Sequence, residues 1–238
     1  MAIDSVRALT FDVFGTVVDW RTSVARQLRE FGARHGLEAD WEAFTDEWRY
    51  DGYIGGIQQV RKGELAFQTA GSLHRRKLEA MLADRGINAI PEADVATLNL
   101  AWHYLDPWPD SVEGLKRLKS KFIISTLSNG EVRLLVDMAK YAGLAWDCIL
   151  SAELTGAFKP EPSCYLNAAR FLGLEPHEVM MVAAHKGDLK AAQAVGFQAA
   201  FVPRPLEAGP SRTPDLTFDD AFQVNANDFL ELASKLGC

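Results

Sequence analysis

Residues 6–16 read VRALTFDVFGT, and this stretch decides the fold class. The run from Val6 to Phe14 is almost continuously apolar and too short for an ordinary helix, which is the pattern of a strand buried on both faces. Asp12 interrupts the run near its end, and Gly15 and Thr16 follow it. The stretch therefore predicts a buried strand of a parallel sheet, with polar side chains where the strand ends.

Further apolar runs of the same kind alternate with stretches of helical pattern along the rest of the chain. The predicted strands are Phe122–Leu127, Cys148–Leu150, Val179–Ala183 and Gln198–Val202, and the predicted helices are Glu131–Ala142, Ser163–Leu172, Asp188–Ala194 and Asn225–Leu236. Strands that alternate with helices are typical of a parallel sheet covered by helices. We therefore expect an α/β fold.

The segment between the first two predicted strands is helical almost throughout and far longer than one crossover helix requires. Four helices are predicted in it: Thr22–His35, Trp41–Tyr50, Leu65–Arg85 and Glu92–Tyr104. We interpret residues 19–105 as an inserted helical cap, and residues 1–18 with 106–238 as the core. Residues 106–109 would be the hinge, and the aromatic side chains of the cap are expected to pack inside it.

Composition and charge exclude several classes of function. The chain is 48% hydrophobic and 24% charged, as in ordinary globular proteins, and its net charge of -7 disfavours nucleic-acid binding. The three cysteines (Cys148, Cys164 and Cys238) have no metal-ligand spacing and are odd in number, which argues against a disulfide framework. No run approaches the roughly 18 apolar residues that cross a bilayer, and no signal peptide is evident. We expect a cytoplasmic protein with no membrane partner.

Polar side chains follow four of the predicted strands. They are Asp12 and Thr16, Ser128 and Asn129, Lys159, and His185 with Asp188. Taken singly, each has a structural explanation, since Asp often caps a helix and Ser-Asn-Gly favours turns. Because ligands bind beyond the carboxyl ends of parallel strands, we expect these side chains to meet in one crevice.

This ordered set resembles the four motifs of the haloacid dehalogenase superfamily. They are an Asp with a Thr four residues later (Asp12 and Thr16), a Ser (Ser128), a Lys (Lys159) and an acidic residue (Asp188). The resemblance covers nearly the whole chain, including the cap after the first strand. It implies a Rossmann-like core with an inserted helical cap.

Two positions separate the chemistries of that superfamily. Its magnesium-dependent phosphatases carry a second acid two residues after the nucleophile and another in the fourth motif, and here these positions hold Phe14 and Ala184. Asp12, a main-chain carbonyl and Asp188 could still hold magnesium weakly, so a phosphatase acting on a small phosphate ester stays as the alternative. The two losses favour the L-2-haloacid dehalogenase branch, which works without metal or cofactor.

The resemblance implies hydrolysis of a short 2-haloacid, including haloacetates, through an alkyl ester on Asp12. Lys159 would orient Asp12, Thr16 would fix its carboxylate, and Asp188 would hold Lys159 or help activate water. Ser128 would anchor the substrate carboxylate, and Tyr165 matches a conserved offset of six residues after Lys159. Phe14 would exclude water from the nucleophile. The predicted partners are the 2-haloacid and water. Relatives are often dimers, so the resemblance also implies a homodimer.

Arg49 and His185 complete the predicted site. The Trp48-Arg49 pair matches one in the cap of the family, so Arg49 would bind the halide with Asn129; the alternative is a solvated Arg49 paired with Asp46 or Glu47. His185 stands where many dehalogenases carry small polar residues. We hypothesise that it contacts the halide, the Asp12 ester or the attacking water.

Overall fold

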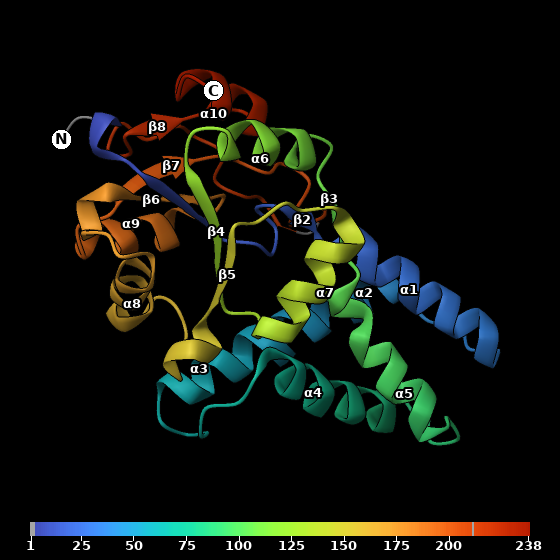
Figure 1. The fold of residues 1–238 in the computed structure, drawn as a ribbon. Helices are drawn as coiled ribbons and strands as arrows, with labels where there is room; N and C mark the ends of the chain where they lie inside the picture. Colours follow the sequence, from blue (N-terminus) through green and yellow to red (C-terminus); the bar gives the residue numbers. More distant parts are fainter. Residues whose placement is uncertain (1–2, 211) are drawn as a thin grey trace.

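The computed structural model describes residues 3–210 and 212–238. Its main sheet has six parallel strands in the order β5–β4–β1–β6–β7–β8 (Figure 1). The strands are β1 (Ala8–Phe11), β4 (Ile123–Ser128), β5 (Cys148–Ser151), β6 (Val179–Ala183), β7 (Gln198–Phe201) and β8 (Val224–Asn225). The predicted α/β class is confirmed.

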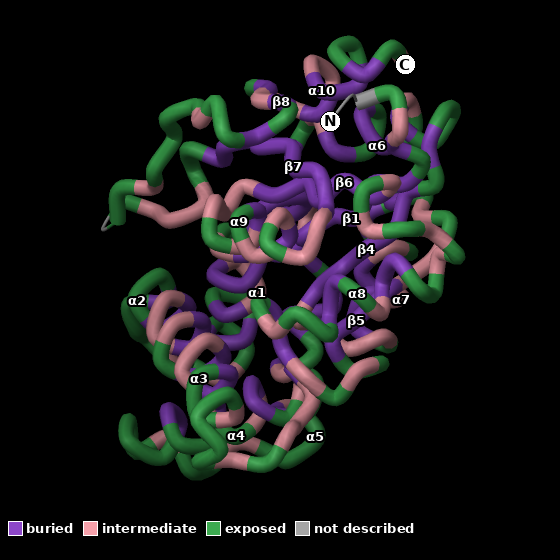
Figure 2. Tube along the Cα trace, turned by 90° about the vertical axis from the view of Figure 1, so that its left-hand side faces the viewer, coloured by how far each residue is buried: buried purple, intermediate pink, exposed green. Residues whose placement is uncertain are grey.

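Helices cover both faces of this sheet. On one face lie α6 (Ser111–Lys119), α7 (Val132–Ala142) and α10 (Phe229–Lys235), and on the other lie α8 (Pro162–Leu172) and α9 (Lys186–Ala194). Strand β6 shows why its sequence is continuously apolar: Met180 and Val182 pack with the first set of helices, and Met181 packs with the second. Strands β1, β6 and β7 are accordingly buried along their whole length (Figure 2).

Strand β1 lies between β4 and β6 and positions the first motif. Its four residues are all buried, and Ala8 is in register with Ile123 on one side and Val179 on the other. The pairing continues one residue beyond the strand, because the Asp12 amide donates to the Val182 carbonyl at 3.0 Å. The backbone of Asp12 is therefore fixed by the centre of the sheet.

A helical segment connects the short strands β2 (Val18–Asp19) and β3 (Asp106–Pro107), which pair with each other in antiparallel orientation. It contains α1 (Trp20–His35), α2 (Trp41–Glu47), a π-helical stretch (Trp48–Ile54), α3 (Gly55–Arg61), α4 (Ala70–Asp84) and α5 (Glu92–Asn99). These helices gather on the side of the molecule away from β8 (Figure 1). The β2–β3 ribbon lies at the residues where the cap was predicted to begin and end.

Several predicted boundaries are wrong, for local reasons. The helix expected from Leu65 begins at Ala70, because the Thr69 side chain caps it. The helix expected from Asn225 begins at Phe229, because Val224–Asn225 pairs with β7 as β8 and Asp228 is the cap. Short 3₁₀ turns at Ile3–Ser5, Leu100–His103, Ala152–Thr155 and Pro176–Glu178 complete the elements. Among the described residues, no helix combines the length and apolar character that a membrane span requires.

Candidate active site

The carboxylate of Asp12 lies at the carboxyl end of β1 and is held from both sides. Its Oδ2 atom accepts a hydrogen bond from Thr16 Oγ1 at 2.8 Å, and Thr16 Oγ1 in turn accepts from the Ala184 amide at 2.9 Å. The loop between Asp12 and Thr16 turns at Gly15, whose φ of 84° is accessible mainly to glycine. Asp12 is 8% exposed, so its orientation is set by these contacts.

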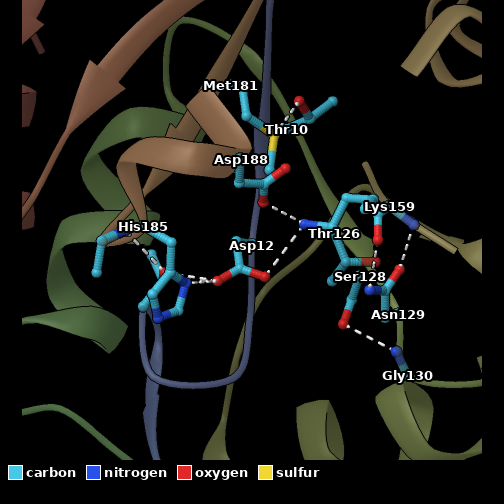
Figure 3. Close-up of polar contacts among 12 residues, drawn as sticks. Thr10, Asp12, Thr126, Ser128, Asn129, Gly130, Lys159, Met181, His185 and Asp188 are labelled. Carbon is cyan, nitrogen blue, oxygen red and sulfur yellow. Dashed lines mark hydrogen bonds and ion pairs between the residues drawn. The ribbon is translucent and has the colours of Figure 1, made fainter. Parts of the chain in front are cut away.

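Lys159 links the first and fourth motifs (Figure 3). Its Nζ donates to Asp12 Oδ1 at 3.1 Å and to Asp188 Oδ2 at 2.5 Å. The backbone of Lys159 is held by Asn129, whose Oδ1 accepts from the Lys159 amide at 2.7 Å. The loop that follows β4 therefore fixes the loop that carries the lysine, and both converge on Asp12.

The charges of this group determine the ionisation of Asp12. Burial acts to raise the pKa of Asp12, but Lys159, His185 and Thr16 outweigh it and hold that pKa well below the usual range of an aspartate. Burial likewise acts to lower the pKa of Lys159, but the attraction of Asp12 and Asp188 raises it above its ordinary value. The pair is an ammonium and a carboxylate at neutral pH, and Asp12 needs no base to become a nucleophile.

His185 contacts Asp12 directly. Its Nδ1 lies 2.9 Å from Asp12 Oδ2, and its Nε2 lies 3.0 and 2.9 Å from the two carboxylate oxygens of Glu207. Burial acts to lower the pKa of His185, but the two carboxylates raise it to about 10. His185 thus lies between two acids, in contact with the carboxylate that would carry the ester, and its role stays a prediction.

A cavity of about 890 Å³ opens beside these residues, between the core and the helical segment. Side chains from both parts line it, among them Asp12, Phe14, Arg49, Tyr53, Asn129, Lys159, His185, Asp188 and Glu207. Phe14 is 3% exposed, and its ring lies 5.8 Å from that of Tyr53. The wall beside the nucleophile is therefore aromatic where a phosphatase of this superfamily carries an acid.

Arg49 reaches this cavity from the π-helical stretch, a form of helix that often occurs at functional sites. Its guanidinium lies over the rings of Phe14, Trp20 and Tyr53, at 5.1, 5.2 and 5.0 Å from their centroids. Its Nη1 is buried and has no hydrogen-bond partner in residues 3–210 and 212–238. An unpartnered guanidinium N–H in an aromatic cage is suited to binding an anion.

The alternative for Arg49, a solvated residue paired with a neighbouring acid, is wrong. Arg49 is 7% exposed. Asp46 pairs with Arg21 at 2.8 Å, and Glu47 pairs with Lys77 and Arg85.

Two predicted binding residues lie behind the cavity wall. Ser128 is fully buried, and its Oγ accepts from the Gly130 amide at 3.1 Å. Tyr165 is fully buried, and its hydroxyl donates to Asp188 Oδ1 at 2.5 Å. Tyr165 therefore acts on the site through Asp188, and direct contact of either residue with a substrate stays a prediction.

A family model described as haloacid dehalogenase-like hydrolase matches residues 6–196. The chain belongs to this family. It is 31% identical over 212 residues to (S)-2-haloacid dehalogenase 4A of Burkholderia cepacia, with 85% of each chain covered.

Solved structures place the chain within the L-2-haloacid dehalogenases of that superfamily. The crystal structure of a defluorinating L-2-haloacid dehalogenase matches with a TM-score of 0.94 and 45% identity, covering 98% of this chain and 96% of the other. A second L-2-haloacid dehalogenase matches with a TM-score of 0.91 and 42% identity, covering 98% and 100%. The predicted Rossmann-like core of the haloacid dehalogenase fold is confirmed.

Two residues of this dehalogenase site were not predicted. Glu207 lies in the loop after β7 and lines the cavity, where no site residue was predicted. Tyr53 packs with Ile57 and Leu73, as expected for an aromatic of the helical segment, and it also lines the cavity. The strand-end rule points to the loop after β7 but does not single out Glu207 within it, and nothing in the sequence distinguishes Tyr53 from a packing aromatic.

Proposed function

We propose that the chain is an (S)-2-haloacid dehalogenase, which releases halide from short 2-haloalkanoates and gives a 2-hydroxyacid. The observation that carries this proposal is an ionised Asp12 lining the cavity beside Lys159, with Phe14 where the acid of a phosphatase would stand. The family of the chain and the names of its relatives support the same reaction. Asp12, Lys159, Asp188, Thr16 and His185 would form the catalytic group.

The first step is a displacement at the carbon that bears the halogen. The ionised Asp12 attacks this carbon from the side opposite the halogen, a new C–O bond forms, and the halide leaves with the electron pair of the C–X bond. The configuration at that carbon is inverted. Because halide is a weak base, no proton donor is needed, which fits Phe14. The Arg49 guanidinium, with Asn129, would bind the departing halide, and Phe14 would exclude water.

The second step is hydrolysis of the Asp12 ester. Water attacks the ester carbonyl carbon, the bond to the alkyl oxygen breaks, and the 2-hydroxyacid leaves. Asp188, whose carboxylate accepts hydrogen bonds from Lys159 and Tyr165, would take a proton from this water. The ammonium of Lys159 offsets the repulsion between Asp12 and the carboxylate of the incoming substrate.

A halide-release assay separates this proposal from the phosphatase alternative. We expect release of chloride or bromide from (S)-2-halopropionates and haloacetates, with the same rate when EDTA is present. Turnover of phosphate esters alone, dependent on added magnesium, would show that the dehalogenase proposal is wrong. Fluoroacetate as an additional substrate tests the release of fluoride, the smallest halide.

Replacing Arg49 with methionine is expected to lower kcat/KM for 2-chloropropionate by about 10²–10³-fold, the usual loss when one electrostatic donor to the transition state is removed. The loss should be smaller for the iodo substrate, because iodide is a better leaving group and depends less on stabilisation. Arg76→Met, which changes a solvent-exposed arginine of α4, is the control. Equal losses for chloride and iodide would mean that Arg49 does not bind the halide.

A further inference from the structure

We propose that His185, held by Glu207, is the donor that stabilises the oxyanion formed on Asp12 Oδ2 while water hydrolyses the ester. This inference rests on the proposed ester mechanism. Of the three contacts that the sequence left open for His185, this is the one with the Asp12 ester. Glu207 is then a positioning residue, because it acts through His185.

The contacts of Asp12 identify which of its oxygens attacks. Oδ2 accepts hydrogen bonds from Thr16 at 2.8 Å and from His185 at 2.9 Å, which occupy both of its lone pairs. Oδ1 accepts from Lys159 alone within the described ranges, so one lone pair remains free. Oδ1 is therefore the nucleophile, and Oδ2 becomes the carbonyl oxygen of the ester.

This assignment places two donors at the oxygen where charge develops. When water adds to the ester carbon, the π electrons of the carbonyl move onto Oδ2, and donors within about 2.7–3.1 Å of that oxygen stabilise the anion. Thr16 and His185 already lie in this range. Because an ionised carboxylate only accepts hydrogen bonds, His185 must donate through Nδ1. Its donor is thus in position before the reaction begins.

The proton balance of this step leaves His185 unchanged. A proton of the attacking water passes to Asp188, and the Cγ–Oδ1 bond breaks with its electron pair on the alkyl oxygen. That oxygen takes the proton from Asp188. The new carboxylic acid of Asp12 then ionises and releases one proton to solvent, which matches the proton formed overall with each halide. His185 holds both of its ring protons throughout.

Glu207 explains how His185 stays protonated when alkylation removes the charge of Asp12. Its carboxylate contacts Nε2 with both oxygens, and Trp20 Nε1 donates to Oε1 at 3.2 Å, which fixes the carboxylate. Gly15 leaves the space for it, since a Cβ at this position would lie 1.9 Å from Glu207 Oε1. The nucleophile loop and the loop after β7 are therefore shaped to place this acid behind the imidazole.

The other ionisable groups around the ring belong to the same cavity. The acids are Asp12, Asp188 and Glu207, and the cations are Lys159, Arg49 and Arg212. The phenols of Tyr50 and Tyr53 also line the cavity. Of these groups, Asp12 and Glu207 are the ones that hydrogen-bond to the ring within the described residues. Removing either of these two carboxylates should therefore change the pKa of His185 more than removing any of the other groups.

Single-turnover kinetics test the assignment of His185, with halide release reporting ester formation and mass spectrometry reporting the ester on Asp12. In His185→Ala, hydrolysis of the ester should slow by about 10²–10³-fold. Ester formation should slow far less, so that the ester accumulates. His177→Ala, which removes an exposed histidine, is the control. If ester formation and hydrolysis slow by the same factor, or if hydrolysis is unchanged, the assignment is wrong.

The pH profile of Glu207→Gln distinguishes an oxyanion donor from a base. A donor must be protonated, so hydrolysis in the wild type should hold its rate through neutral pH and fall only as His185 loses its proton. In Glu207→Gln the rate of hydrolysis should begin to fall about one pH unit lower than in the wild type. Glu207→Asp should regain part of the pH range over which the rate is constant. Nitrogen-15 NMR of His185 should show the same shift in its titration.

Two outcomes would overturn the inference. A rate of hydrolysis that rises with pH through the titration of His185 would identify a general base. A profile unchanged in Glu207→Gln would show that Glu207 does not act through the imidazole. In either case a burst of halide with an ester on Asp12 would leave the proposed function intact, whereas the absence of any ester in the wild type would refute that function instead.

Discussion

Asp12→Asn is expected to reduce halide release by at least about 10⁴-fold, the scale of loss when a covalent nucleophile is removed. The substitution keeps the size of the side chain. It replaces a carboxylate whose pKa is held low by Lys159 and His185 with a neutral amide that cannot displace halide. The measurement is the rate of chloride release from (S)-2-chloropropionate, followed over hours to capture a slow residual rate.

Asp84→Asn serves as the matched control, since Asp84 is an exposed aspartate at the end of α4 that does not line the cavity. Its activity should equal that of the wild type. A residual rate in Asp12→Asn within tenfold of the wild type, with the folded state shown by circular dichroism, would mean that Asp12 is not the nucleophile.

Lys159→Met is expected to lower both activity and stability. Lys159 is 7% exposed and bridges the buried carboxylate of Asp12 and the partly buried carboxylate of Asp188, so its removal leaves the two acids close together without a counter-charge. Breaking a buried ion pair in this way costs about 3–5 kcal/mol of the free energy of unfolding. Loss of one electrostatic contact at the reacting group should lower kcat/KM by about 10²–10³-fold.

Urea denaturation and steady-state kinetics measure the two effects on the same sample. Lys116→Met is the control, because Lys116 is exposed and its pair with Glu113 is at the limit of contact, 4.0 Å. Because the pKa of Lys159 is raised in the folded protein, its charge persists across the range in which the enzyme is assayed. A destabilisation no larger than that of Lys116→Met would show that the bridge does not hold the site together.

The convergence of the motifs could be predicted from the sequence because it follows from topology. Parallel strands end at one edge of a sheet, so residues that follow β1, β4 and β6 meet whatever the details of packing. Strand β1 was recognised from an apolar run that only a strand buried on both faces requires. Its predicted end at Phe14 was too late, since the chain turns after Asp12 to bring Thr16 back to the carboxylate.

The remaining features depend on tertiary contacts that leave no periodic pattern. Strands β2 and β8 have two residues each, too few for any alternation. The π-helical stretch that carries Arg49 has the same local composition as an α-helix, so the sequence predicted one helix through Tyr50. Glu207 is a single acid in a loop, and only its contact with His185 gives it a role.

Single turnover in water enriched in oxygen-18 tests the covalent role of Asp12 most directly. With enzyme in excess over (S)-2-chloropropionate, the ester path carries the oxygen of water into the Asp12 carboxylate, while the 2-hydroxyacid receives an unlabelled oxygen from Asp12. Mass spectrometry of the peptide containing Asp12 should therefore show the heavy oxygen, and the product should not. A labelled product with an unlabelled Asp12 would mean that water attacks the substrate directly, which would contradict the covalent mechanism.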